Sequence, residues 1–177
     1  MIDSEGIYKK ARSLVQFHGT RDPILISQAS GIDVMPLDGV TELLGMYVYR
    51  WKHRIIFLNN RMDFYLTKMV CAHELGHDIY HRPLAKEGGM KEFELFRMKN
   101  STEYEANAFA AHLLIDTGEC LEYAREGYDV VQIASLMNSE INLMLIKLQE
   151  LIRLGYNLRL PMAPRNDFFK KIRADDN

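Results

Sequence analysis

The sequence predicts an α+β fold, in which a small domain of helices and a short β-hairpin or sheet is followed by a helical C-terminal part. Residues 46–51 and 54–59 are rich in β-branched and aromatic residues, and Lys52 and His53 separate them, which predicts a hairpin. Apolar residues recur at helical spacing before this hairpin and again from Met62 onward. The order helices, strands, helices is typical of an α+β domain.

Two helices are predicted ahead of the hairpin. Apolar residues recur at helical spacing through residues 3–18, while basic residues lie on the other side of the same helix. A second, short helix is expected over residues 23–30, because Asp22 can act as its N-cap, Pro23 suits its first turn and Gly31 ends it. Extended chain then leads into the hairpin.

Helical periodicity returns after the hairpin. A helix is expected from Met62 to about Tyr80, because Pro83 cannot continue it. Residues 82–100 break the pattern and predict either an irregular loop or a short edge strand. Four further helices are predicted, over residues 102–115, 119–126, 130–137 and 140–154.

This order divides the chain into three predicted parts. Residues 1–118 form the main domain, and residues 119–157 form a helical C-terminal subdomain. Residues 158–177 contain Pro161 and Pro164 and end in charged residues, so a loosely structured tail is expected. A length of 177 residues fits one domain with such an appendage.

Composition predicts a soluble cytoplasmic protein. Hydrophobic residues make up 47% of the chain, and the net charge of -2 gives no general attraction to phosphate backbones, so direct nucleic-acid binding is not expected. The two cysteines, Cys71 and Cys120, form no CxxC pair and fit a reducing compartment. The N-terminus has no signal-peptide character, and no apolar run reaches the roughly 18–20 residues that cross a membrane.

An HExxH motif lies in the helix predicted to end at Tyr80. His73 and His77 are four residues apart, so they share one helix face and their imidazoles can converge on one zinc ion. Zinc lowers the pKa of its bound water towards neutrality. Glu74 follows His73 directly, so its carboxylate can take a proton from that water as general base and later pass one to the leaving amine.

HExxH also arises by chance, so the residues around the motif decide whether it indicates a metal site. Here it lies inside an amphipathic helix, with Val70, Leu75 and Ile79 as apolar support. Gly76 costs about 1 kcal/mol relative to Ala inside a helix. That cost is explained if another element must approach the helix closely there; the alternative is an incidental packing glycine.

A catalytic zinc site needs a third protein ligand, and His81 is the first candidate. His73 and His81 are eight residues apart, about 12 Å along a helix at roughly 1.5 Å per residue, so they cannot easily share one ion. A supporting role for His81 near the site is favoured over simple exposure to solvent. The metzincin pattern is absent, because Tyr80 and Pro83 stand where its glycine and third histidine belong.

The next predicted helix offers Glu103 as a better third ligand. Glu103 and Asn107 share a face of that helix, so Glu103 could bind zinc while Asn107 steadies a neighbouring ligand. Ala106 lies beside this face and permits close approach. Glu105 points elsewhere and, with Thr102, fits a T-x-x-E capping box. Glu103 is therefore preferred to Glu105, although acidic residues favour a helix N-terminus even without a metal.

The motifs HELGHDIYH and EYEANAFAAHLLI, in this order and spacing, resemble the ImmA/IrrE family of metallopeptidases. The resemblance covers roughly residues 60–116, and the layout of helices and hairpin before them is also similar. It implies a zincin-like metallopeptidase domain, in which His73, His77 and Glu103 bind zinc and Glu74 is the general base.

The resemblance also implies a function. Members of this family are often encoded on phages and integrative elements, and they cleave a helix-turn-helix repressor, which derepresses genes; a related branch acts in bacterial stress responses. The main hypothesis is therefore a zinc endopeptidase that acts on such a repressor in the cytoplasm. The alternative is a metal-containing anti-repressor or sensor that binds its partner without cleaving it. One departure is His112, where the family often has Glu.

Other segments suggest supporting roles. Residues 130–154 have some helix-turn-helix character, but their weak, even charge favours a helical bundle packed on the catalytic domain over DNA contact, with a surface for the repressor as a third option. The segment 82–100 could border the substrate groove or be a surface loop. Its candidates for lining a groove are Phe93, Leu95 and Phe96. The candidates for stabilising an oxyanion are Tyr80, Tyr104 and His112.

Overall fold

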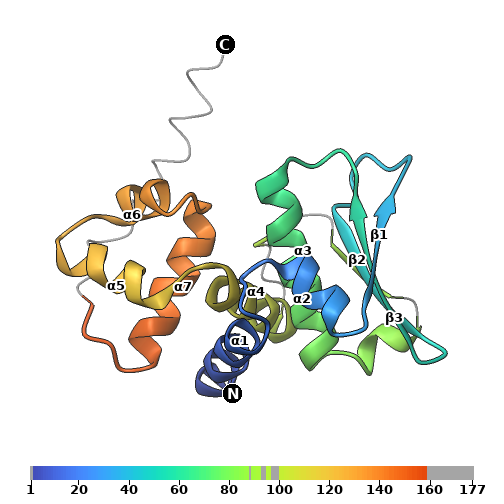
Figure 1. Cartoon of the computed structure of the whole chain (residues 1–177), viewed down its shortest axis with the longest axis horizontal. Coiled ribbons are helices and arrows are strands. Elements are labelled where there is room, and N and C mark those ends of the chain that lie inside the picture. Colours follow the sequence, from blue (N-terminus) through green and yellow to red (C-terminus); the bar gives the residue numbers. More distant parts are fainter. Residues whose placement is uncertain (1, 88, 93–94, 97–99, 159–177) are drawn as a thin grey trace, which may run out of the picture.

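The computed structural model describes residues 2–87, 89–92, 95–96 and 100–158, which form an α+β fold (Figure 1). The helices are α1 (Ser4–His18), α2 (Pro23–Ala29), α3 (Phe64–Tyr80), α4 (Ser101–Leu114), α5 (Thr117–Arg125), α6 (Val130–Leu136) and α7 (Ile141–Arg153), with a short 3-10 turn at Leu84–Glu87. The strands are β1 (Asp33–Leu37), β2 (Gly45–Arg50), β3 (His53–Asn59) and β4 (Met90–Glu92). The helices and the hairpin lie where the sequence predicts them.

The sheet has the strand order β1-β3-β2-β4. The predicted hairpin is confirmed, since β2 and β3 pair antiparallel and are joined by Trp51 and Lys52, both at positive φ (50° and 67°). Two residues at positive φ give a turn whose twist matches that of the strands. β1 pairs parallel with β3, and β4 pairs antiparallel with β2. β4 therefore confirms the edge-strand alternative for part of the segment 82–100.

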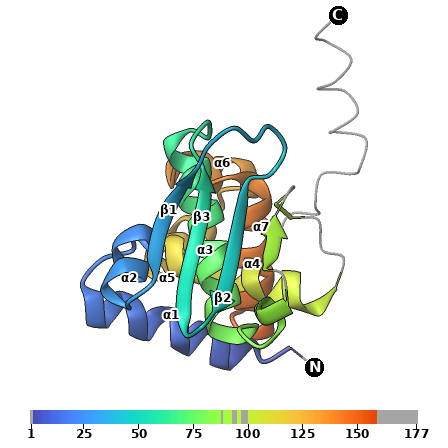
Figure 2. The ribbon, with the colours of Figure 1, turned by 90° about the vertical axis from the view of Figure 1, so that its right-hand side faces the viewer.

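The helix that carries HExxH lies between the sheet and α4. Figure 2 shows the sheet in front of α3, and Figure 1 shows α4 on the side of α3 away from the strands. A Cβ added at Gly76 would lie 3.0 Å from the Cα of Ala106. The close approach predicted from Gly76 is thus confirmed, and it brings α4 against the metal-motif face of α3.

A buried polar cluster fixes α3 on the sheet next to His77. The hydroxyl of Tyr47 on β2 donates to Asp78 Oδ1 at 2.7 Å, and Arg54 on β3 donates to Asp78 Oδ2 at 3.2 Å. Asp78 is almost fully buried, so these charge-assisted bonds have little competition from water. The rotation of α3 about its axis, and hence the direction of its histidines, is set by these contacts.

α4 begins at a different cap from the predicted one. Asn100 is the N-cap, and its side-chain oxygen accepts a hydrogen bond from the backbone N–H of Glu103 at 3.0 Å. Thr102 lies inside the first turn and donates its hydroxyl to Asn100 Oδ1. The capping box of Thr102 and Glu105 is therefore wrong, because an amide side chain one turn earlier already serves the free N–H groups.

The C-terminal helices are joined to α4 mainly through α7, on which α6 packs, while α5 packs on α6. In Figure 1, α5, α6 and α7 lie on the opposite side of α4 from the sheet. α7 is buried along one face, and Tyr104 of α4 donates to Glu150 of α7 at 2.6 Å. α6 and α7 are joined around Asn138, which has φ 49°. The favoured alternative, a helical bundle on the catalytic domain, agrees with this packing.

The predicted loose tail, residues 158–177, lies outside the described residues except for Leu158. Within the described part of the chain, none of the helices combines the length and the apolar character that crossing a membrane requires.

Candidate metal centre

Three side chains from two helices converge between α3 and α4. The Nε2 atoms of His73 and His77 lie 3.0 Å apart, as expected for residues one turn apart on one face. Glu103 Oε2, from the first turn of α4, lies 3.3 Å from Nε2 of His73 and 3.7 Å from Nε2 of His77. These ligand atoms all lie within 4.8 Å of one another. The structure therefore brings together the three residues that the sequence analysis selected.

Asn107 orients His73 from one turn further along α4. Its side-chain oxygen lies 3.0 Å from Nδ1 of His73, and both groups are buried. An amide oxygen can only accept, so Nδ1 of His73 carries the proton and donates it. The lone pair of Nε2 is then directed at His77 and Glu103, where a metal ion would lie. This is the supporting contact predicted for Asn107.

His81 orients His77 in the same way. Its Nδ1 lies 3.0 Å from Nδ1 of His77, and its Nε2 lies 3.0 Å from Oε2 of Glu105. Because Glu105 accepts from Nε2 of His81, the Nδ1 of His81 accepts from His77, and Nε2 of His77 is left unprotonated. The structure thus places His81 in the predicted supporting position, and it gives Glu105 a partner outside the cluster of His73, His77 and Glu103.

Glu74 lies beside this cluster with a buried and unsatisfied carboxylate. Both carboxylate oxygens are inaccessible to solvent and have no hydrogen-bond partner among the described residues. β2 passes closely over it at Gly45, where an added Cβ would lie 3.0 Å from Glu74 Oε1. Burial raises the pKa of Glu74 to about 8. A buried carboxylate without partners is costly unless a water molecule or an ion completes it, which fits a residue adjoining a metal.

Comparison with known proteins identifies the family. The family described as the IrrE N-terminal-like domain, a peptidase family, matches residues 27–149. The chain belongs to the ImmA/IrrE family of metallopeptidases.

Two relatives are similar to this chain over most of its length. "Uncharacterized immunity region protein 2" of Bacillus phage phi105 is 31% identical over 121 residues, covering 68% of this chain and 75% of that protein. "Metallopeptidase ImmA" of Bacillus subtilis (strain 168) is 27% identical over 143 residues, covering 76% of this chain and 79% of that protein. The matched region includes the two helices that carry the cluster in this ImmA/IrrE member.

Glu92 is a residue of the site that the sequence analysis missed. It is buried on the edge strand β4, and its Oε2 lies 3.2 Å from Nε2 of His73. The available signal was its place in the segment 82–100, for which a border of the substrate groove was one of the two alternatives. Of the groove candidates in that segment, Leu95 and Phe96 pack half-buried against the core, and Phe93 lies outside the described residues.

The electrostatics of the cluster favour a positive charge between the imidazoles. Burial would lower the pKa of His73, but the carboxylates of Glu103 and Glu92, which accept hydrogen bonds from its ring, outweigh burial and raise that pKa to about 10. Burial would likewise raise the pKa of Glu103, but His73 and His77 hold it well below its usual range. Nitrogen and carboxylate ligands beside surplus negative charge fit a divalent cation, so the residues present suit the metal that the family implies.

Two of the three residues considered for oxyanion stabilisation face away from the cluster. Tyr104 donates to Glu150 at 2.6 Å, and Nδ1 of His112 lies 3.1 Å from Nζ of Lys147, so both side chains turn towards α7. Tyr80 packs edge-on against Phe109, with ring centroids 6.0 Å apart. Of the three open candidates, Tyr104 and His112 therefore point away from the cluster, because the helical C-terminal part covers the face of α4 on which they lie.

Replacing Asn107 by Leu should weaken metal binding without unfolding the protein. Leu has nearly the same size, but it removes the acceptor that fixes the tautomer of His73. Loss of a residue that hydrogen-bonds a metal ligand typically lowers metal affinity by about 10–100-fold. Competition with a chromophoric chelator measures this affinity, and Asn142→Leu on α7 is the control. An Asn107→Leu affinity equal to that of the wild type would contradict the orienting role.

Proposed function

We propose that this ImmA/IrrE member is a zinc-dependent endopeptidase, with His73, His77 and Glu103 as zinc ligands and Glu74 as general base. The observation that carries the proposal is the cluster of two imidazoles and one carboxylate with the unpartnered Glu74 carboxylate beside it. Three protein ligands leave a fourth position of a tetrahedral ion open, as in catalytic zinc sites.

The chemistry follows from where these groups stand. A zinc ion held there would supply Lewis acidity, which lowers the pKa of a water molecule and polarises a peptide carbonyl. Glu74 takes the proton of the attacking water and returns one to the leaving nitrogen. Burial raises the pKa of the Glu74 carboxyl above its usual range, which brings it nearer to neutral pH and favours proton exchange in both directions. Asn107 and His81 keep the two imidazoles in the required tautomers.

We further propose that the substrate is a helix-turn-helix repressor in the cytoplasm, and that its cleavage relieves repression of phage, mobile-element or stress genes. Two relatives support this choice, since one is named as a phage immunity region protein and the other as the metallopeptidase ImmA. A selective protease of this kind needs a partner that presents one peptide bond to the site.

Metal removal tests the proposal directly. The purified protein should cleave a helix-turn-helix repressor encoded in the same genomic neighbourhood, and 1,10-phenanthroline should abolish cleavage by removing zinc. Adding zinc, but not magnesium, should restore the original rate, because imidazole ligands select zinc over magnesium. Gel densitometry of the repressor fragments over time measures the rate. Cleavage that continues at the same rate without metal would contradict a metallopeptidase mechanism.

A further inference from the structure

A second polar site lies on the opposite side of α4 from the sheet, where α1, α4 and α5 meet. A cavity of about 510 Å³ opens there, a size typical of small-molecule sites. It is lined by Arg12 and Tyr8 of α1, by His112 of α4 and by Thr117 at the start of α5. None of its lining residues belongs to the metal cluster.

A buried lysine lies directly behind the wall of this cavity. The side chain of Lys147, from α7, is fully buried, with its Nζ 2.8 Å from Oγ1 of Thr117 and 3.1 Å from Nδ1 of His112. Both partners are neutral, and among the described residues no carboxylate forms an ion pair with this ammonium. A buried ammonium without a counter-ion is unusual, because burial penalises the charged form. Burial lowers the pKa of Lys147 to about 7.

His112 adds an unused donor next to this ammonium. Because an ammonium can only donate, Nδ1 of His112 accepts from Lys147, and Nε2 carries the proton. Nε2 is buried and has no partner among the described residues. Burial and the neighbouring Lys147 lower the pKa of His112 to about 3, so the ring is neutral and cannot repel the lysine. A buried N–H donor without a partner and a buried amino group without a counter-ion among the described residues therefore lie side by side behind the cavity wall.

The rim of the cavity adds a second free cation. Arg12 is exposed and forms no ion pair within the described residues. Arg21 also lines the cavity, but it is already held by the carbonyl of Leu113 at 2.8 Å and by the carboxylate of Asp116. Asp116 is the acidic group of the lining, and its charge is offset by Arg21. The surplus charge of the site is therefore positive.

The remaining walls are aromatic and aliphatic. Tyr8, Val15, Leu121 and Tyr156 line the cavity, and the ring of Tyr8 meets that of His112 edge-on with centroids 5.2 Å apart. An inorganic ion alone would leave these surfaces uncovered. A molecule with an oxyanion at one end and an apolar or aromatic body would pair with the cationic groups and cover the apolar walls.

We propose that this cavity binds a small organic anion, whose phosphate or carboxylate group pairs with Arg12 and offsets the charge of Lys147, which lies behind the cavity wall next to His112. Since Lys147 belongs to α7 and His112 to α4, the bound anion strengthens the contact between the C-terminal helices and the helix that carries Glu103. The proposal rests on this cavity alone and holds whether or not the metal site cleaves peptides.

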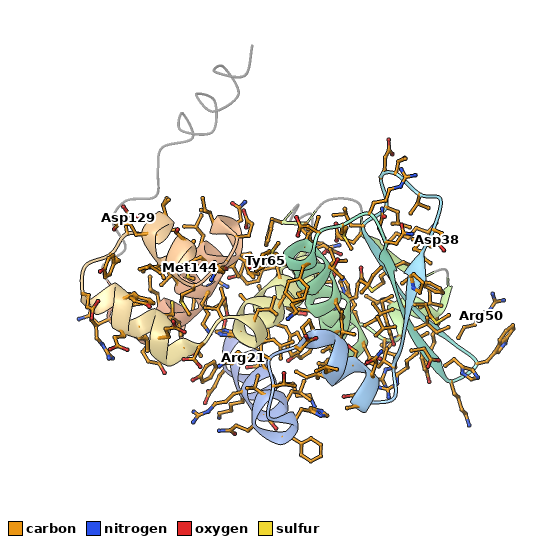
Figure 3. All side chains as sticks on the ribbon, turned by 45° about the horizontal axis from the view of Figure 1, so that its top comes forward. Arg21, Asp38, Arg50, Tyr65, Asp129 and Met144 are labelled. Carbon is orange, nitrogen blue, oxygen red and sulfur yellow. The ribbon has the colours of Figure 1, made fainter. Side chains whose placement is uncertain are left out.

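Isothermal titration calorimetry on the full chain tests the site with three probes: phenyl phosphate, benzoate and inorganic phosphate. Either organic probe should bind saturably, and more tightly than inorganic phosphate, because only the organic probes cover the aromatic walls. Arg12→Gln and Lys147→Met should each weaken binding at least about tenfold, as expected for loss of a charge-assisted contact. Arg50→Gln should not, since Arg50 extends from the far end of the hairpin, away from Arg21 (Figure 3).

The calorimetric outcomes distinguish the possible ligands. Preference for phenyl phosphate assigns a phosphate ester as the ligand, and preference for benzoate assigns a carboxylic acid. If no organic probe binds saturably, or if Arg12→Gln and Arg50→Gln bind with equal affinity, the proposal is overturned. Arg12 is exposed, so its variant folds and keeps the test valid even if Lys147→Met does not. The NMR signal of the His112 Nε2 proton, assigned with His112→Gln, should shift on binding.

Discussion

Glu74→Gln should abolish repressor cleavage while the protein keeps its fold and its zinc. Gln has the shape of Glu, so it fits beneath Gly45 on β2, but its amide cannot take a proton from water. General base catalysis of this kind typically contributes about 10²–10⁴-fold to the rate. Single-turnover cleavage of the repressor, followed by gel densitometry, should show a loss of at least this size.

The matched controls separate catalysis from structure. Glu42→Gln changes an exposed carboxylate outside the cluster and should cleave like the wild type. Zinc content by elemental analysis and thermal unfolding should be the same in Glu74→Gln and the wild type. Unchanged cleavage in Glu74→Gln would remove Glu74 from the mechanism. If Glu74→Gln still relieves repression in cells, the function lies in binding the repressor, which is the alternative hypothesis.

Local patterns predicted much of this fold. The start of α2 followed the predicted cap Asp22, whose side chain accepts from the N–H of Ile24 at 3.0 Å, and the hairpin followed its β-branched runs. Gly76 indicated close packing because a glycine inside a helix has a local cost that needs a reason. These features depend on residues near one another in the chain, so a single sequence contains the information.

Apart from the Asn100 cap of α4, the contacts that the sequence did not predict join distant segments. Glu92 reaches His73 because β4 adds to β2, and no periodicity shows that a three-residue strand pairs there. The spacing of Glu105 from Thr102 suggests a cap, whereas its partner is His81, the residue that follows α3. His112 was considered for the active site because α4 carries Glu103, but its side chain lies on the face that α7 covers. Helical spacing gives the faces of a helix and not the element against which each face packs.

The same distinction underlies the expected result for Glu103 and Glu105, which are two residues apart on α4. Glu103→Ala should lose zinc, because it removes the carboxylate whose oxygen lies 3.3 Å and 3.7 Å from the two histidine Nε2 atoms. The zinc affinity of Glu103→Ala should fall by more than the roughly 10–100-fold expected when a residue that only hydrogen-bonds a metal ligand is removed. Cleavage of the repressor should fall with zinc occupancy.

Glu105→Ala is the matched variant for this experiment, because it removes a carboxylate two residues along α4 that does not belong to the cluster. It leaves both histidines and Glu103 in place and removes only the partner of His81, so about one zinc per chain should remain, at an affinity lowered by no more than about 100-fold. Elemental analysis after gel filtration measures occupancy in both variants. Zinc that followed Glu105 would make the assigned ligand wrong but leave a metallopeptidase. If both variants kept zinc, neither Glu103 nor Glu105 would be needed to bind the ion, and the proposed ligand set would be wrong.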